Sequence, residues 1–263
     1  MKIACTDDNR YLVDNKSWTD EVVRHGLSYM EFAMSKLPEN EADMDEVITY
    51  ALSQGVKLNL HSPYGINNIA STDSARRASS IANLKRTIDV AAKYNLGAVA
   101  FHPGRLSDEN DNPEEIWASM MDVVSDIAQY AKEKKVFVGI ENMELRPYEL
   151  VYTIEDLNRF APFAENNPYF GVTIDFAHYA SLGIGFPDLS ALKLPIYDVH
   201  VSQIVNGVMH SGFIGPDCEP DIDEVCRLLA DYGYDGLIVL ETRERIWESA
   251  KMLRTAFKAL NCE

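Results

Sequence analysis

The sequence predicts an α/β protein that forms a single (β/α)₈ barrel over residues 1–263. Short apolar runs typical of buried strands alternate with segments whose apolar residues recur at helical spacing. Seven of the eight expected strands carry a histidine or a carboxylate at or near their end, and these residues recur at intervals of 25 to 41, which fits one strand, one helix and their loops. No linker or low-complexity tract interrupts this pattern, so we expect one domain.

The first half of the chain supplies four strand–helix pairs. Strands are expected at residues 2–6, 27–32, 56–60 and 97–101, where short runs are mostly apolar. The first helix covers residues 17–25 and starts at Ser17, a residue type that caps helices. The second has Val47 and Ile48 on its apolar face and stops at Gly55. The third covers residues 72–94, and the fourth begins at Pro113, because proline suits the first helical position.

The second half repeats the alternation less regularly. Strands are expected at residues 136–140, 169–174, 196–201 and 236–240. A short helix follows at 154–163, whereas Gly183, Gly185 and Pro187 interrupt the helix after the sixth strand. Residues 222–232 and 246–260 carry clean helical stripes. A doubly wound sheet is the alternative fold, but no glycine-rich phosphate-binding fingerprint follows the first strand.

Composition favours an intracellular protein that acts on small molecules. The formal net charge is −17, which argues against tight binding to a nucleic-acid backbone. The N-terminal segment contains acidic residues and no signal-peptide pattern, and no apolar run is long enough to span a bilayer. The 4 cysteines lack paired spacing and are interpreted as free thiols. We therefore expect a cytoplasmic protein without a membrane or nucleic-acid partner.

Six apolar runs end in a potential metal ligand, namely His61, His102, Glu141, Asp175, His200 and Glu241. In a barrel the C-terminal strand ends meet at one mouth, where active sites are found. Three carboxylates and one imidazole on strands five to eight (Glu141, Asp175, His200 and Glu241) suit a divalent cation such as Mn²⁺, Mg²⁺, Co²⁺ or Zn²⁺. Without a cation, three carboxylates in one mouth would repel one another and take up protons.

Other side chains near the strand ends are candidates for substrate binding or for ordinary structure. Arginines that follow strand ends could clamp a carboxylate or a phosphate, and a tyrosine could stack on a sugar ring. Surface salt bridges and core packing are the alternatives for these residues. His61 and His102 could equally be satisfied by loop carbonyls. The candidates for substrate binding are Arg105, Arg243 and Tyr64, with Arg146 in a similar position.

The motifs around these residues resemble those of the xylose-isomerase-like barrel superfamily, which includes sugar isomerases, ketose epimerases, inosose-processing enzymes and the endonuclease IV family. The matching segments are VGIENME, TIDFAH, VHVS and LET, which contain Glu141, Asp175, His200 and Glu241. The resemblance covers essentially the whole chain. It implies one divalent metal held by these four residues, with His178 of the DxxH motif near the substrate or a further metal.

Two further segments resemble the endonuclease branch more sharply. These are LHSPYGINNIAS, which contains His61, and FHPG, which contains His102. In that branch the two histidines would bind a second metal that Glu141 bridges to the first. A second metal is therefore possible.

A third metal of the endonuclease branch would need His178 together with an Asp-x-His motif. The corresponding segment here reads Val208-Met209-His210, so the histidine is present but valine replaces the carboxylate. The glycine-rich turn expected soon after it is also altered, although Asp217 within it could substitute as a donor. The third metal site is expected to be damaged.

The favoured function is a metal-dependent isomerase or epimerase of a sugar, a sugar phosphate or an inosose-like ring. The cation would bind adjacent carbonyl and hydroxyl oxygens and stabilise an enediolate. In the resembled epimerases two glutamates flank the metal, so Glu141 and Glu241 would remove and return the proton. Return to the same carbon gives epimerisation, transfer to its neighbour gives isomerisation, and dehydration shares the first step.

Two alternatives belong to other classes. One is a multi-zinc phosphodiesterase acting on abasic DNA, which the additional histidines favour and the acidic charge disfavours. The other is a metal-binding barrel without catalysis, serving as a sensor or as a subunit of a complex. Barrels of this kind often pair, so a homo-oligomer is possible.

Overall fold

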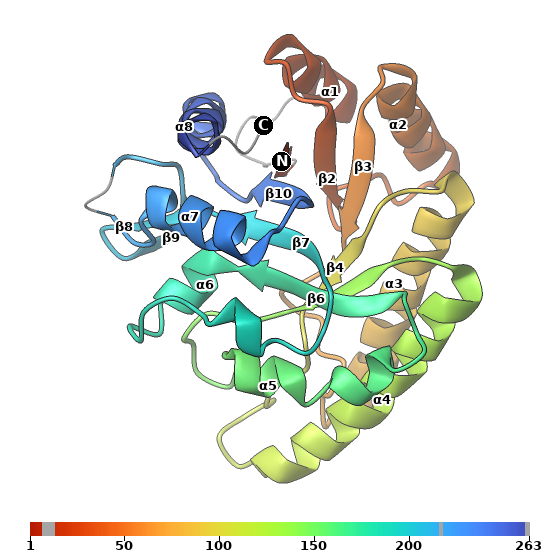
Figure 1. Ribbon diagram of the computed structural model, residues 1–263. Helices are drawn as coiled ribbons and strands as arrows, with labels where there is room; N and C mark the ends of the chain where they lie inside the picture. Colours follow the sequence, from red (N-terminus) through yellow and green to blue (C-terminus); the bar gives the residue numbers. More distant parts are fainter. Residues whose placement is uncertain (7–13, 216–217, 261–263) are drawn as a thin grey trace.

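The computed structural model describes residues 1–6, 14–215 and 218–260, and it confirms the (β/α)₈ barrel (Figure 1). Parallel strands close into a barrel in the order β1-β10-β7-β6-β5-β4-β3-β2, so the first strand pairs with the last. Asp217, the substitute donor considered above, lies outside the described residues. The barrel strands are β1 (Lys2–Thr6), β2 (Tyr29–Ala33), β3 (Lys57–His61), β4 (Val99–Phe101), β5 (Val138–Glu141), β6 (Phe170–Asp175), β7 (Ile196–Val201) and β10 (Leu237–Leu240).

Helices follow the strands and cover the outside of the barrel (Figure 1). The long helices α3 and α4 lie side by side on the same flank of the molecule. The helix after β6 is short, as the sequence predicted. The α-helices are α1 (Asn15–Arg24), α2 (Glu41–Ser53), α3 (Ser74–Tyr94), α4 (Pro113–Lys134), α5 (Ile154–Asn158), α6 (Phe176–Ala180), α7 (Ile222–Tyr232) and α8 (Ile246–Ala259), and the 3₁₀ turns are η2 (Ala161–Ala164) and η3 (Leu189–Ala191).

Two local expectations were wrong. Helix α1 is capped by Asp14, whose carboxylate accepts the backbone N–H groups of Lys16 and Ser17, so Ser17 is not the cap. The sequence around His210 predicts a loop, but the chain after β7 forms an antiparallel pair of short strands, β8 (Gln203–Val205) and β9 (Val208–Ser211), which places His210 in a strand. The turn between these strands contains Asn206 and Gly207, both with positive φ, a typical hairpin signal.

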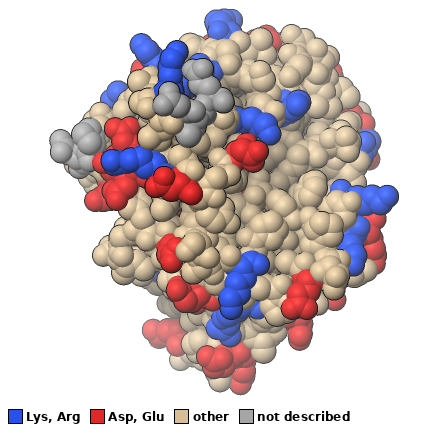
Figure 2. Space-filling model, in the orientation of Figure 1, with Lys and Arg blue, Asp and Glu red and all other residues tan. Residues whose placement is uncertain are grey.

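The surface carries both signs of charge. On the face seen in Figure 2, basic side chains lie beside acidic ones. Among the described residues, no helix is both long and apolar enough to cross a membrane.

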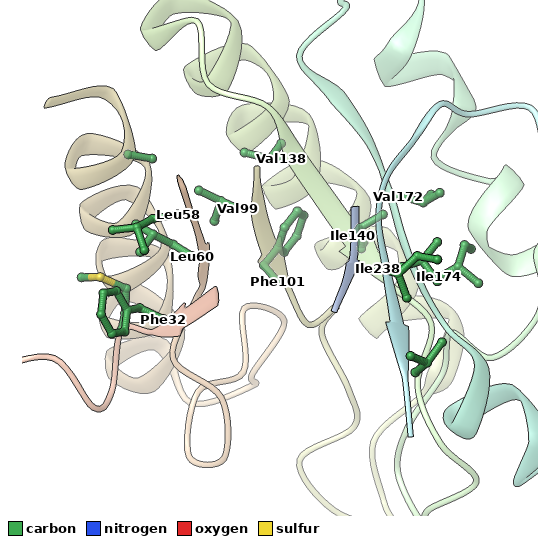
Figure 3. Close-up of a cluster of buried hydrophobic side chains, with 14 of the residues drawn as sticks. Phe32, Leu58, Leu60, Val99, Phe101, Val138, Ile140, Val172, Ile174 and Ile238 are labelled. Atoms are coloured by element: carbon green, nitrogen blue, oxygen red, sulfur yellow. The ribbon is translucent and has the colours of Figure 1, made fainter. Parts of the chain in front are cut away.

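Each barrel strand presents apolar side chains outward and a different set inward, because successive residues of a strand point to opposite faces. The outward residues pack against the helices and form the main core, which Figure 3 shows for several strands. Leu58 and Leu60 of β3, for example, belong to this core, whereas Asn59 and His61 between them do not. The side chains labelled in Figure 3 are Phe32, Leu58, Leu60, Val99, Phe101, Val138, Ile140, Val172, Ile174 and Ile238.

Most inward-facing positions are small, polar or charged. A minor apolar cluster of Ala4, Leu237 and Val239 fills the interior beside β1 and β10. Elsewhere glycine keeps strands close together, since a Cβ at Gly139 would lie 2.5 Å from Thr173 Oγ1. Polar residues buried in the barrel are costly unless they are paired or hold a ligand. The interior is therefore organised around a polar site.

Candidate metal centre

The barrel register brings all six predicted strand-end residues into one mouth. His61, Glu141 and Asp175 are the last residues of β3, β5 and β6, and in β6 and β7 Asp175 pairs with His200. His102 and Glu241 directly follow β4 and β10. These residues occupy the inward parity of their strands, so their side chains meet inside the C-terminal end of the barrel.

The quartet that the sequence assigned to one metal is assembled. Glu141, Asp175, His200 and Glu241 offer ligand atoms that all lie within 4.8 Å of one another. His200 Nδ1 lies 3.0 Å from Glu241 Oε2 and 3.2 Å from Glu141 Oε1. Asp175 Oδ1 accepts the backbone N–H of His178, which leaves Oδ2 directed into the site.

A second group shares Glu141 with the quartet. His61 Nε2 and His102 Nε2 lie 3.2 and 3.3 Å from Glu141 Oε2, whereas Glu141 Oε1 faces His200. The ligand atoms of the three residues lie within 4.8 Å of one another. The two oxygens of Glu141 therefore face two different groups of candidate metal ligands, as the oxygens of a carboxylate that bridges two metals would.

A third group consists of Asp175, His178 and His210, again with ligand atoms within 4.8 Å. Strand β9 brings His210 to the mouth, where its ring centroid lies 5.2 Å from that of His178. Val208, which stands where the endonuclease branch has a carboxylate, is half exposed. Asp175 is therefore the carboxylate of this group, and Val208 contributes no ligand to it.

The charges of the mouth are tightly coupled. Burial alone would raise the pKa of Glu141, but the charge of His200 and hydrogen bonds from several imidazoles outweigh it and hold the pKa well below its usual range. Burial alone would lower the pKa of His61 and His178, yet the surrounding carboxylates raise each to about 9. At His102 burial prevails and the pKa is lowered. The positive imidazoles therefore offset the buried carboxylates, and a metal cation would take over this role by displacing imidazole protons.

The donor set fits a divalent cation. Glu141 Oε1 and Asp175 Oδ2 are buried and have no hydrogen-bond partner among the described residues. Buried carboxylate oxygens without donors are costly, and a cation would satisfy them. Three carboxylates and one imidazole are ligands that Mn²⁺, Co²⁺, Mg²⁺ and Zn²⁺ accept.

Above the metal-ligand candidates lies a cavity of about 310 Å³, large enough for a small ligand. Tyr64 and Arg243 line it, together with His61, His102, His178, His210 and Glu241. The Tyr64 ring stacks on that of His102, with centroids 5.7 Å apart. Arg105 does not line this cavity; it faces a neighbouring recess and donates to the Gly65 carbonyl at 2.5 Å.

Glu144 lines the cavity and escaped the site prediction, whereas Arg146, which pairs with it, was named above beside the substrate-binding candidates. Glu144 Oε2 lies 3.2 Å from His178 Nε2, and the Arg146 guanidinium lies 2.7 Å from the other Glu144 oxygen. Glu144 stands three residues after Glu141 in the VGIENME segment, but it lies beyond the end of β5, where strand parity no longer indicates direction. Only the folded loop shows that its side chain turns into the mouth.

A second set missed by the sequence lies deeper in the barrel. Glu31 of β2 and Asp198 of β7 are fully buried, and their ligand atoms lie within 4.8 Å of those of His200. The signal was available, because Glu31 interrupts an apolar strand and Asp198 precedes His200 by two residues and shares its parity.

Fold and site together define a (β/α)₈ barrel with groups of candidate metal ligands at the C-terminal strand ends. Residues 19–261 match the family described as "Xylose isomerase-like TIM barrel", so the chain belongs to that family. Among curated relatives, the "Probable endonuclease 4" of Acholeplasma laidlawii is 22% identical over 84% of this chain and 75% of the relative.

Solved structures share the whole fold. A "D-tagatose 3-epimerase-like protein" superposes with a TM-score of 0.84 at 21% identity, covering 99% of this chain and 98% of the other. The IolI protein "with a binding zinc atom" has a TM-score of 0.74 at 17% identity, covering 99% and 98%. At such identities the likeness shows the fold alone.

Proposed function

We propose that this protein is a divalent-metal-dependent isomerase or epimerase of a small polyhydroxy carbonyl compound, such as a sugar or a sugar phosphate. The observation that carries the proposal is the quartet of Glu141, Asp175, His200 and Glu241, of which Glu241 lines a cavity of about 310 Å³. The cavity size suits a compact ligand. The structural neighbours described as epimerase-like and as zinc-bound also support this proposal.

A bound divalent cation would supply Lewis acidity, which stabilises negative charge on a carbonyl oxygen during deprotonation. The protein's own residues supply the proton transfers. Glu241 is the better placed acceptor, because its side chain is 21% exposed and lines the cavity. Burial alone would raise the pKa of Glu241, but the neighbouring His210 and His200 outweigh it and keep the carboxylate ionised.

Glu141 is proposed to return the proton from the other side of the site. It is fully buried, so it acts in a water-poor environment where electrostatic effects are strong. His61 Nε2–H lies 3.2 Å from Glu141 Oε2 and would supply the proton that Glu141 delivers, because the Nδ1–H of His178 is donated to the Asn142 carbonyl at 2.8 Å. The proton that Glu241 takes up would leave to solvent through the cavity, and reprotonation of the His61 imidazole would close the cycle. His178 also lines the cavity, where it would donate a hydrogen bond to a substrate oxygen.

A second candidate function is a multi-zinc phosphodiesterase acting on abasic DNA. The specific observation in its favour is that Glu141 joins the quartet to the His61–His102 pair, while Asp175 joins it to His178 and His210. Adjacent metal groups of this kind suit in-line displacement at phosphorus. The endonuclease relative supports it, whereas the net charge of −17 disfavours it.

Metal stoichiometry of the purified protein, followed by activity measurements, separates these functions. We expect about one Mn²⁺, Mg²⁺ or Co²⁺ per chain, and turnover of one member of a ketose and ketose-phosphate panel. Two or three zinc ions per chain with cleavage of an abasic-site duplex would favour the phosphodiesterase. Tight metal binding with neither activity would indicate a non-catalytic barrel, and no metal binding even after reconstitution would refute the metal-dependent mechanism.

A further inference from the structure

Glu31 is a carboxylate buried inside the barrel. Its side chain is 1% exposed, and neither Oε1 nor Oε2 has a hydrogen-bond partner within the described part of the chain. It points inward from β2, level with Thr6 of β1 and Asn59 of β3 in the parallel register. A carboxylate in such surroundings carries a desolvation cost that requires a function or a partner.

Glu31 lies beside the imidazole ring of His200. Glu31 Oε2 lies 3.4 Å from His200 Nε2, while His200 Nδ1 faces Glu141 and Glu241 on the opposite side of the ring. The two ring nitrogens therefore face different groups: Nε2 faces Glu31, and Nδ1 faces Glu141 and Glu241. A neutral imidazole carries one proton, and the group that accepts it determines which nitrogen is left to coordinate a metal.

We propose that Glu31 is a positioning residue, which accepts the Nε2–H of His200 and thereby keeps the Nδ1 lone pair directed at the metal position of the quartet. This inference rests on the proposed function, since it concerns a ligand of that metal. The arrangement matches a general rule: a ligating histidine donates its other N–H to a carboxylate or carbonyl, which fixes the tautomer and increases ligand basicity.

Asp198 lies beside Glu31 and His200, deeper in the barrel than the mouth, and supports their arrangement. Its Oδ2 accepts a hydrogen bond from Asn59 Nδ2 at 2.6 Å, and its Oδ1 accepts the backbone N–H of Val199 at 3.0 Å. Asp198 is therefore already fixed by two N–H donors and lies against Glu31 and His200. It limits the space into which the Glu31 carboxylate could turn.

The same three residues could in principle hold a cation of their own, because Glu31, Asp198 and His200 form a donor group. That arrangement would require His200 to coordinate through both nitrogens and lose its last ring proton. A hydrogen bond from Nε2–H to a carboxylate keeps the imidazole neutral, so the geometry favours positioning over a second cation.

The test compares metal binding by wild type, Glu31→Gln and Glu31→Leu, with Thr173→Val as the matched control. Thr173 is also buried in the barrel interior, and its hydroxyl has no hydrogen-bond partner among the residues that the structure describes, so its replacement removes a polar atom without changing the His200 contact. Circular dichroism and thermal unfolding establish that each variant is folded. Dissociation constants for Mn²⁺ and Co²⁺, and the visible absorption spectrum of the Co²⁺ protein, are then measured.

Loss of the acceptor is expected to weaken metal binding about 10- to 100-fold in Glu31→Leu and to shift the Co²⁺ spectrum. Glu31→Gln retains a carbonyl acceptor and should lose less, while Thr173→Val should match wild type. Unchanged affinity and spectrum in a folded Glu31→Leu protein would overturn the inference. So would loss of one whole equivalent with the remaining affinity intact, which would make Glu31 a ligand.

Failure of the proposed function gives a different result. Wild-type protein that binds no metal would overturn both conclusions, whereas wild type that binds metal but turns over no carbonyl substrate would overturn the isomerase and leave the role of Glu31 standing. The readouts used for Glu31 are affinity and spectrum, so they do not depend on knowing the substrate.

Discussion

The two glutamates assigned to proton transfer differ sharply in their surroundings. Glu141 is fully buried, and four imidazoles lie within 3.6 Å of its oxygens. The Glu241 side chain is 21% exposed and faces the cavity. One carboxylate is thus suited to hold the site together, and the other to meet the substrate.

Replacing Glu241 by glutamine tests that division. The substituted side chain would keep an oxygen that can coordinate the metal but could not accept a proton, so we expect turnover to fall by about 10²- to 10⁴-fold while bound metal is retained. The measurements are kcat on the substrate found by the panel and metal content by elemental analysis. Glu248→Gln, at an exposed position of α8, is the control. Unchanged kcat in Glu241→Gln would remove Glu241 from the mechanism.

At the scale of single residues, the sequence predicted which strand-end side chains lie together but not which of their atoms contact one another. The sequence placed six residues together because each ends an apolar run and the C-terminal strand ends of a barrel meet at one mouth, and the structure brings them together there: His61, His102, Glu141, Asp175, His200 and Glu241. Glu144 was missed because it lies in a loop, and loops have no fixed periodicity. Glu31 and Asp198 were left out of the site although their positions carried a signal, because the sequence does not show that both lie beside His200.

Among the secondary-structure elements, the strand ends hold most candidate metal ligands, and the helices pack around the barrel and stabilise it. Local capping signals fix several helix starts, and α4 shows this clearly. Asn112 Oδ1 accepts the backbone N–H of Glu114 at 3.0 Å, and Pro113 occupies the first turn. The helix then packs against α3 and the barrel through residues such as Met120 and Ile127.

Removal of this cap should lower stability without touching the site. Asn112→Ala is expected to lower the free energy of unfolding by about 1 kcal/mol, because the first turn loses the acceptor of a backbone N–H. Denaturant unfolding measures the loss, and Asn112→Asp, which keeps an acceptor, should remain close to wild type. A metal dissociation constant that changes along with stability would contradict the separation of helix and site.

Strand and helix positions were predicted more reliably than connections. The strands were found to within a few residues because their apolar runs are short and distinct. The β8–β9 pair was not foreseen, since three- and four-residue strands carry too little pattern. Its consequence for the site is considerable, because β9 delivers His210 to the mouth.

For the whole molecule, the proposed metal contributes to stability as well as chemistry. A ligand that binds only the folded state at 100 times its dissociation constant adds about 2.7 kcal/mol to the free energy of unfolding. Chelation should therefore lower the melting temperature, and Mn²⁺ or Co²⁺ added back should restore it by roughly 5–10 °C for a chain of this size. Differential scanning fluorimetry checks this. His200→Ala should show a much smaller metal-dependent shift, and an equal shift would place the metal elsewhere.

The barrel itself was predictable because every level of the sequence agreed on it: alternation, spacing and polar strand ends. The substrate was not, because cavity shape depends on loops that no periodic pattern describes. The net charge of −17 argues against a nucleic-acid partner but does not identify the substrate.

The alternation along each strand has an evolutionary consequence. Outward residues such as Leu58 and Val138 hold the scaffold, while their immediate neighbours Asn59 and Gly139 face the interior. Mutations at one set can thus accumulate with little penalty to the other. This separation fits the observation that a protein with 21% sequence identity superposes on 99% of this chain.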